Sequence, residues 1–141
     1  MKTLIIDASV VAAAFFAEEH ATIARKILSG AATLCAPDFI TVEVASVIWK
    51  RHRRGEMESS EAMDLLADAD GLPLMKTPAS DLTDSALQLA MRIDRSISDC
   101  LYLALAVRAS GVMITADKRL VHAVAASPLK NHIAFLGDMS V

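Results

Sequence analysis

Two kinds of hydrophobic pattern alternate along this chain. Short runs of adjacent apolar residues are typical of buried strands, whereas apolar residues that recur every three or four positions are typical of amphipathic helices. Glycine, proline and capping residues separate these segments. The strands predicted in this way are Thr3–Ile6, Thr33–Ala36, Leu72–Met75, Val112–Thr115 and Ile133–Leu136.

Helices are predicted between and after these strands. Ser9 is expected to cap the first helix, and Gly55 to end the third. No neighbouring strands are joined by a hairpin-length loop, so the alternation predicts one α/β domain over residues 1–141, with a parallel sheet of about five strands and helices on both faces. The expected helices are Val10–Ala17, Ala21–Leu28, about Phe39–Arg54, Ser59 or Ser60 to Ala69, Ser80 or Asp81 to Ile93, Ser98–Ser110 and Lys118–Ala126.

The composition narrows the possible functions. Hydrophobic residues make up 54% of the chain and aromatic residues only 4%, which suits helices packed on a sheet better than a β-sandwich. The formal charge of −3 argues against a protein that binds nucleic acid through bulk charge alone. It does not exclude a nuclease, because bound metal ions add positive charge where the phosphate binds.

The cysteines, histidines and N-terminus indicate a cytoplasmic protein without a zinc site. Cys35 and Cys100 lie in apolar stretches, as reduced buried thiols do, and the four histidines show no ligand spacing. The apolar N-terminal segment resembles a signal peptide, but Asp7 interrupts it and argues against that interpretation. No window is long enough and apolar enough to predict a membrane span.

Three acidic residues stand alone inside apolar sequence. Asp7, Glu43 and Asp99 each interrupt a long run that contains no other charged residue. An ionised carboxylate in such a buried run is costly unless it is paired. Asp7 can alternatively be read as a helix N-cap and Asp99 as a first-turn acid, whereas Glu43, between two valines, has no capping role.

The predicted elements bring a fourth acid, Asp117, into the same region. Asp7 and Asp117 follow predicted strands, while Glu43 and Asp99 lie in the first turns of predicted helices. Ligands of open parallel sheets bind beside the carboxyl ends of the strands, so the four carboxylates are expected to converge. An all-oxygen set selects Mg²⁺ or Mn²⁺, and such a site supports phosphodiester hydrolysis. Taken alone, Asp117 could also be a solvated helix cap.

The same positions carry a resemblance to a known family. Leu4-Ile5-Ile6-Asp7, Ala36-Pro37-Asp38-Phe39 leading to Glu43, Ser98-Asp99-Cys100-Leu101-Tyr102 and Thr115-Ala116-Asp117 resemble, in order, the four acidic blocks of PIN domains. The resemblance covers nearly the whole chain, and the ordered set is more specific than any single block.

This resemblance implies a function and its partners. It implies a Mg²⁺-dependent endoribonuclease similar to the toxin of VapBC-type toxin–antitoxin pairs, held inactive by an antitoxin protein and usually dimeric. It implies that Asp7, Glu43, Asp99 and Asp117 bind the metal and that the hydroxyls of Ser9 and Thr115 support them. Some members carry a further acid directly after the fourth, where this chain has Lys118 and Arg119.

One basic run and one competing function remain open at this stage. Lys50, Arg51, Arg53 and Arg54, around His52, follow Glu43 along the same predicted helix. They can be favourable charges at a helix C-terminus, or they can contact RNA or a partner. Receiver domains and haloacid-dehalogenase-type phosphatases are excluded, because their acidic pairs are missing. A catalytically silent PIN-like module that binds protein or RNA remains the alternative.

Overall fold

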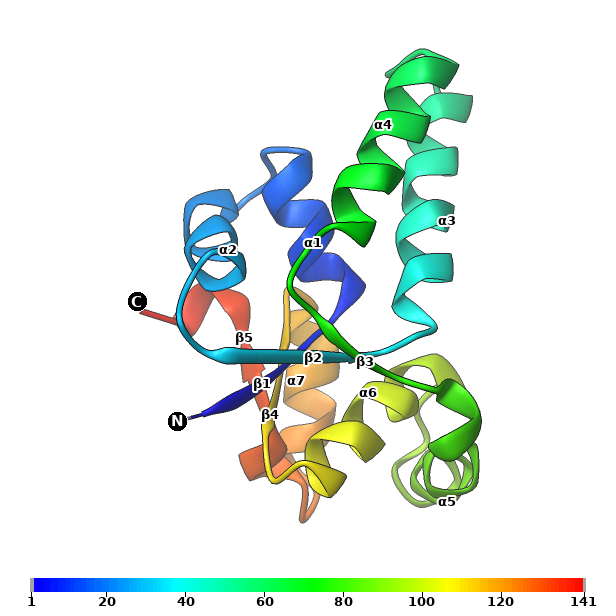
Figure 1. Cartoon of the computed structure of the whole chain (residues 1–141). Coiled ribbons are helices and arrows are strands. Elements are labelled where there is room, and N and C mark those ends of the chain that lie inside the picture. Colours follow the sequence, from blue (N-terminus) through cyan, green and yellow to red (C-terminus); the bar gives the residue numbers. More distant parts are fainter. Residues whose placement is uncertain (1, 141) are drawn as a thin grey trace.

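The computed structural model describes residues 2–140, and its centre is a five-stranded, entirely parallel sheet. The strand order is β3-β2-β1-β4-β5, so the chain builds outward from β1 on one side and then returns to the other side of β1 (Figure 1). The predicted α/β class and the parallel sheet with five strands are confirmed. The strands are β1 Thr3–Ile6, β2 Thr33–Pro37, β3 Met75–Thr77, β4 Val112–Thr115 and β5 Ile133–Phe135.

Helices cover both faces of this sheet, as the alternation predicted. Figure 1 shows α1 to α4 on one side and α5 to α7 on the other, which follows from right-handed crossovers that run in opposite directions from the central strands. The helices are α1 Ala8–Phe15, α2 Ala21–Leu28, α3 Ile40–Arg53, α4 Ser59–Asp70, α5 Thr83–Ile93, α6 Ile97–Arg108 and α7 Lys118–Ala125.

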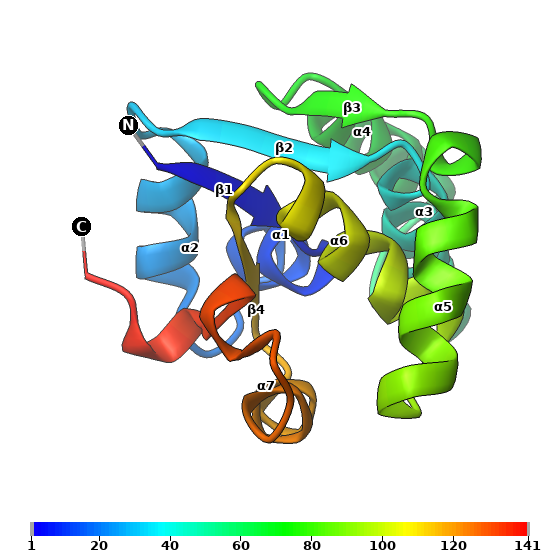
Figure 2. The same ribbon diagram turned by 90° about the horizontal axis from the view of Figure 1, so that it is seen from below.

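The core lies between the sheet and its central helices. Helix α6 packs against β1, β2 and β4, and Figure 2 shows it crossing this part of the sheet. Its residues from Cys100 to Ala106 are all buried, which explains why the run is apolar without a helical stripe. Burial of this surface, at about 25 cal/mol per Å² of apolar area, is the main stabilising contribution. Side chains at the ends of α6 are therefore held by a rigid core.

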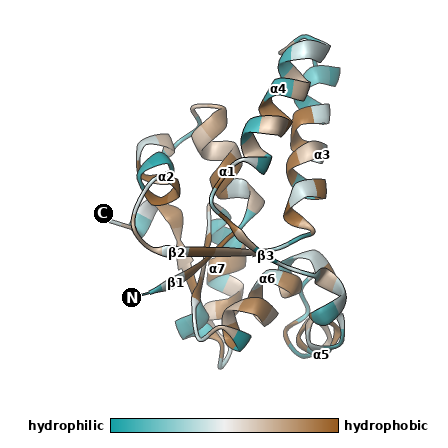
Figure 3. Cartoon of the chain, in the orientation of Figure 1, coloured by the Kyte–Doolittle hydropathy of each residue, from teal (hydrophilic) through white to brown (hydrophobic). Residues whose placement is uncertain are grey.

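Helices α3 and α4 form a hairpin that extends away from the sheet (Figure 1). Figure 3 shows hydrophobic colour concentrated on the strands and more hydrophilic colour toward the tip of this hairpin. Gly55 follows α3 with a φ of +80°, a left-handed conformation that glycine adopts without strain, so its predicted role in ending the helix is confirmed. Among residues 2–140, no helix is long and apolar enough to cross a membrane.

Several predicted boundaries are wrong, and each has a local reason. Strand β3 begins at Met75, later than the predicted Leu72, because Pro73 has no N–H for a ladder and the amide of Leu74 donates to the carbonyl of Leu72 (2.8 Å). Helix α5 is preceded by a separate 3₁₀ turn at Ala79–Asp81, so it begins at Thr83. The prediction had started the helix at Ser80 or Asp81.

The predicted caps of two helices are also wrong. Ser9 lies inside α1, which begins directly after Asp7, so Ser9 does not cap this helix. Helix α6 begins at Ile97, before the predicted Ser98, because the Ser96 side chain caps it by accepting a hydrogen bond from the amide of Asp99 (3.1 Å). The hydroxyl of Ser9 is consequently available for a different contact.

Candidate active site

The candidate site lies where the strand order reverses, beside the carboxyl ends of β1 and β4. Ile6 of β1 is paired with Ile114 of β4, so Asp7 and Thr115 are the next opposed positions. The amide of Asp7 donates to the carbonyl of Ile114 (3.2 Å), which fixes the backbone at this point. Such a switch point is where open parallel sheets bind ligands, as expected for Asp7 from the sequence.

Two hydroxyl groups hold the Asp7 carboxylate. Thr115 Oγ1 donates to Asp7 Oδ2 (2.6 Å), and Ser9 Oγ donates to the same oxygen (2.9 Å). The Ser9 oxygen also accepts from the amide of Ala116 (2.9 Å), so its position is fixed from β4. Thr115 is completely buried, which leaves its hydroxyl little freedom. Both hydroxyls therefore lie where they can support Asp7.

A tyrosine from a different helix holds the Glu43 carboxylate. Glu43 lies in the first turn of α3 and is partly buried. Tyr102, buried in α6, donates its hydroxyl to Glu43 Oε1 (2.5 Å). A hydroxyl that donates to a carboxylate forms a short, charge-assisted bond of this kind. Tyr102 thus fixes the orientation of Glu43 relative to α6.

Asp99 and Asp117 enter from the first turn of α6 and from the residue before α7. Asp99 is partly buried, whereas Asp117 is exposed. Asp117 caps α7, because its Oδ1 accepts from the amides of Arg119 (3.0 Å) and Leu120 (3.1 Å). The capping interpretation of Asp117 is therefore correct as a structural role, and it occupies only one of the two carboxylate oxygens.

The charges that act on Asp7 and Glu43 indicate that three of these carboxylates share one crevice. Burial raises the pKa of Asp7, and the hydrogen bonds from Thr115 and Ser9 lower it in part. The negative charge of Asp99 raises this pKa further. Burial likewise raises the pKa of Glu43; the hydrogen bond from Tyr102 lowers it, and the charges of Asp7 and Asp99 raise it. Asp7, Glu43 and Asp99 are thus brought together.

Asp117 joins this group through Asp99. Burial raises the pKa of Asp99, whereas a hydrogen bond with Ser96 lowers it. The nearby negative charge of Asp117 raises this pKa further, and the positive charge of Arg95 lowers it. None of the ion pairs described for residues 2–140 involves any of the four acids. The group is therefore an acidic crevice in which negative charge is only weakly compensated.

The donor set suits a hard divalent cation. All four candidates offer carboxylate oxygens, and the hydroxyl bonds to Asp7 and Glu43 use one oxygen of each. Mg²⁺ and Mn²⁺ prefer oxygen ligands, and a cation would relieve the repulsion that raises these pKa values. Within the described part of the chain, however, no three acidic, histidine or cysteine side chains already surround one point. The carboxylates would have to turn inward to complete a metal site.

The basic run at the end of α3 has structural contacts. Arg51 forms ion pairs with Glu18 and with Glu56 (3.1 Å), and its guanidinium lies 4.1 Å from the centroid of the Phe16 ring. Arg54 pairs with Glu56 (3.3 Å). Eight residues of helix, roughly 12 Å at 1.5 Å per residue, separate Arg51 from Glu43.

The remaining side chains of this run are exposed. Arg53 lies over the Trp49 ring, 5.3 Å from its centroid, and Lys50 is exposed on the same helix. No basic residue of the run contributes to the shifted pKa values of the carboxylates. An RNA contact by Lys50, Arg51, Arg53 or Arg54 stays a prediction.

Two residues that influence the site were missed at the sequence level. Tyr102 lies three positions after Asp99, on the same face of α6, so its spacing alone could have identified it. Arg95, in the loop before α6, gave no signal, because its proximity to Asp99 depends on how that loop folds.

Comparison with known proteins relates the sequence to one family. Residues 4–126 match the PIN domain family. The chain is 31% identical over 119 residues to Ribonuclease VapC3 from Pyrobaculum aerophilum, an alignment that covers 83% of this chain and 91% of that protein.

Solved structures share the fold at lower identity. PAE2754 from Pyrobaculum aerophilum superposes with a TM-score of 0.70 at 20% identity, covering 96% of this chain and 85% of that one. Mycobacterium tuberculosis VapC20, described as a sarcin-ricin loop cleaving toxin, superposes with a TM-score of 0.63 at 16% identity, covering 85% and 94%. These two likenesses concern the fold.

Proposed function

Because this chain belongs to the PIN-domain family, we propose that it is a Mg²⁺-dependent endoribonuclease that hydrolyses RNA phosphodiester bonds. One observation carries the proposal: three carboxylates from separate elements crowd a single crevice, where Asp99 raises the pKa of both Asp7 and Glu43, and none of the three has an ion-pair partner among the described residues. Crowded ionised acids destabilise a fold unless a cation binds or some of them are protonated, and such groups cluster at functional sites. A ribonuclease is favoured because the 31% identical relative is a ribonuclease.

Each side chain has a defined part in this proposal. Asp7, Glu43 and Asp99 hold a divalent cation, and Asp117 contributes the oxygen that does not cap α7. A bound cation would supply positive charge beside the phosphate and a water of lowered pKa, whose oxygen adds to phosphorus as a P–O bond breaks. Three hydroxyl groups support these ligands: those of Ser9 and Thr115 orient Asp7, and that of Tyr102 orients Glu43.

We further propose that the chain is the toxin of a VapBC-type pair, forming a homodimer and binding an antitoxin protein. Support comes from the named relative and from large apolar side chains on the helices that are exposed in the single chain. Examples are Trp49 (52% exposed), Met63 (65%) and Met91 (72%). Light scattering is expected to give twice the monomer mass, and a monomer at all accessible concentrations would contradict the dimer.

A silent PIN-like module is the competing function. It predicts that the crowded acids have no catalytic use, although their charges cost stability. The hydroxyl contacts to Asp7 and Glu43 favour the enzyme, since they orient the very groups that a silent domain could lose without consequence.

Purified Asp99→Asn distinguishes the two functions. The ribonuclease proposal expects loss of Mg²⁺-dependent cleavage of single-stranded RNA, with a melting temperature equal to or above that of wild type. The exposed Asp64→Asn, on the outer surface of α4, is the matched control and should cleave normally. A folded Asp99→Asn with full activity, or wild type without activity, would overturn the proposal.

A further inference from the structure

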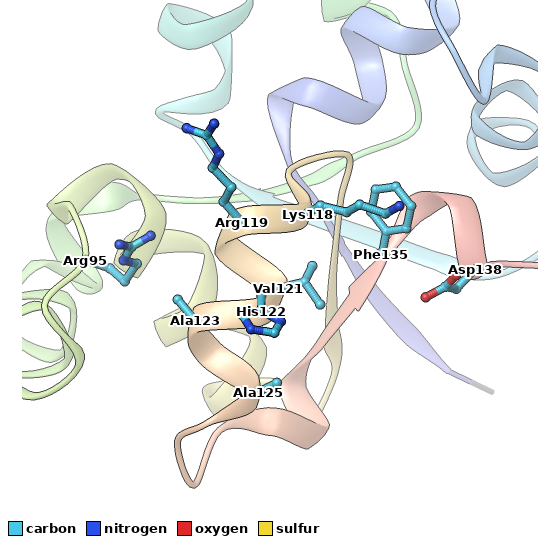
Figure 4. Close-up of a pocket in the computed structure, with 9 residues that line it drawn as sticks. All are labelled: Arg95, Lys118, Arg119, Val121, His122, Ala123, Ala125, Phe135 and Asp138. Atoms are coloured by element: carbon cyan, nitrogen blue, oxygen red, sulfur yellow. The ribbon is translucent and has the colours of Figure 1, made fainter.

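A groove runs along α7, whose first residues directly follow Asp117. It has a volume of about 640 Å³ and is lined from α7, from the α5–α6 loop and from β5 (Figure 4). We call it the α7 groove; the residues used below are Arg95, Lys118, Arg119, His122, Phe135 and Asp138. We propose that its basic side chains bind the phosphates of single-stranded RNA that flank the scissile one, an inference that rests on the ribonuclease function proposed above.

The charge of this groove differs from that of the molecule. Arg95, Lys118 and Arg119 line it, while Asp138 is its one acidic lining residue in the described chain, although the protein carries a net charge of −3. Unlike Arg51, none of these three basic side chains takes part in an ion pair described for residues 2–140. The charges of Lys118 and Arg119 are therefore available to a ligand that brings negative charge of its own, whereas Arg95 also acts on Asp99.

Three residues that line the groove are neighbours of the candidate active site. Lys118 and Arg119 directly follow Asp117, and both are exposed. On the opposite side, the guanidinium of Arg95 lies close enough to Asp99 to lower the pKa of that carboxyl. Figure 4 shows Arg95 entering from the α5–α6 loop and Arg119 from the start of α7. If the scissile phosphate of an RNA strand lies at the proposed metal site, the adjacent phosphates of the same strand would therefore lie near these three basic side chains.

An aromatic side chain favours nucleic acid over an acidic protein segment. Lys118 extends along Phe135, with its Nζ 5.1 Å from the ring centroid (Figure 4). The same two residues also line a second hollow of about 300 Å³ that reaches His20, but Glu18 and Glu19 line that hollow as well, so the basic surface ends at the ring. Sites for single-stranded nucleic acid combine a basic groove with aromatic rings on which bases stack. Phe135 supplies such a ring next to the cations.

The test measures RNA binding in EDTA, where the protein cannot cleave. The probe is a labelled, mixed-sequence single-stranded RNA of about 12 nucleotides, titrated with full-length protein at several salt concentrations. The variant is the double substitution Lys118→Gln/Arg119→Gln. It keeps the backbone amide of residue 119, which donates a hydrogen bond to the helix cap Asp117. The control Lys26→Gln/Arg92→Gln removes the same charge from exposed positions on α2 and α5 that do not line the groove.

The groove variant should bind roughly 10–30-fold more weakly than wild type near 100 mM salt, because each lost phosphate contact removes about 0.7 from the slope of log K against log salt. The two substitutions should thus make that slope shallower by about 1.4 in total. The control pair should keep the wild-type slope. Circular dichroism melting establishes that both variants are folded.

Three results would overturn the groove proposal. The first is wild-type affinity and slope in the groove variant; the second is an equal loss in the control pair, which would reflect net charge alone. The third is loss of binding to a polyglutamate peptide with RNA binding intact, which would assign the groove to an acidic protein. A wild-type protein that binds RNA through the groove but never cleaves it with Mg²⁺ contradicts the proposed enzyme and leaves the groove in place.

Discussion

The two ends of helix α3 both stand out in the sequence, yet they have different parts in the structure. At its start, Glu43 is partly buried, accepts a hydrogen bond from Tyr102 and is repelled by Asp7 and Asp99. At its end, Arg51 is compensated by two glutamates and an aromatic ring, and its neighbours are exposed. The difference teaches that charge density along the sequence does not show whether a charge is compensated in the fold: the single carboxylate is repelled by its neighbours, whereas Arg51 within the dense run is neutralised.

The largest effect is expected at the start of α3. Glu43→Gln removes a carboxylate from the proposed metal site, so Mg²⁺-dependent RNA cleavage should fall by more than about 100-fold. The fold should remain intact, because the charge that is removed is repelled by its neighbours. Initial rates and melting curves measure the two effects. Cleavage within a fewfold of wild type would remove the distinction between the two ends of the helix.

Tyr102→Phe tests the start of α3 indirectly, because Tyr102 contacts the proposed metal ligand Glu43 and not the metal itself. Loss of the hydrogen bond to Glu43 should reduce cleavage by about 10–100-fold, as losing a residue that orients a metal ligand typically does. Raising the Mg²⁺ concentration should restore part of the rate, because the ligand is misplaced and not lost. A lowered melting temperature with an unchanged Mg²⁺ requirement would show that Tyr102 is only structural.

The other end of α3 should affect stability instead. Arg51→Gln removes two ion pairs and a cation–π contact, which together contribute about 1–2 kcal/mol. The melting temperature should fall by roughly 3–7 °C for a chain of this length. Lys50→Gln, at the adjacent exposed position, should change it by less than about 2 °C. A stable Arg51→Gln with weakened RNA binding would instead assign the basic run to the substrate.

The smallest effect is the pH dependence of stability at Glu43. Because the folded state raises the pKa of Glu43, its charge destabilises the fold at neutral pH, and protonation on acidification removes that cost. In EDTA, Glu43→Gln should therefore melt above wild type at pH 7. The gap should narrow as the pH falls through the raised pKa of folded Glu43, and it should be closed below the ordinary glutamate pKa of about 4.3. A gap that is constant between pH 7 and pH 4 would contradict the assigned repulsion.

The hydrophobic pattern by itself determined the layout of the domain. Each strand pattern in the centre of the sheet matched a strand, because strands buried on both faces must be apolar along their whole length. The same reasoning identified Asp7, Glu43 and Asp99, since a charge inside such a run needs a reason to be there. Family membership then followed from the order of these blocks.

Only the tertiary structure decided which groups surround those acids. The hydroxyls of Thr115 and Tyr102 meet Asp7 and Glu43 across more than 50 residues of sequence, a separation that no local pattern encodes. The α7 groove likewise joins Arg95 to Lys118 through loop geometry, whereas the contiguous run at the end of α3 is compensated by glutamates from other segments. Burial leaves a periodic trace in sequence, but charge compensation depends on distance in space, and folding alone sets that distance.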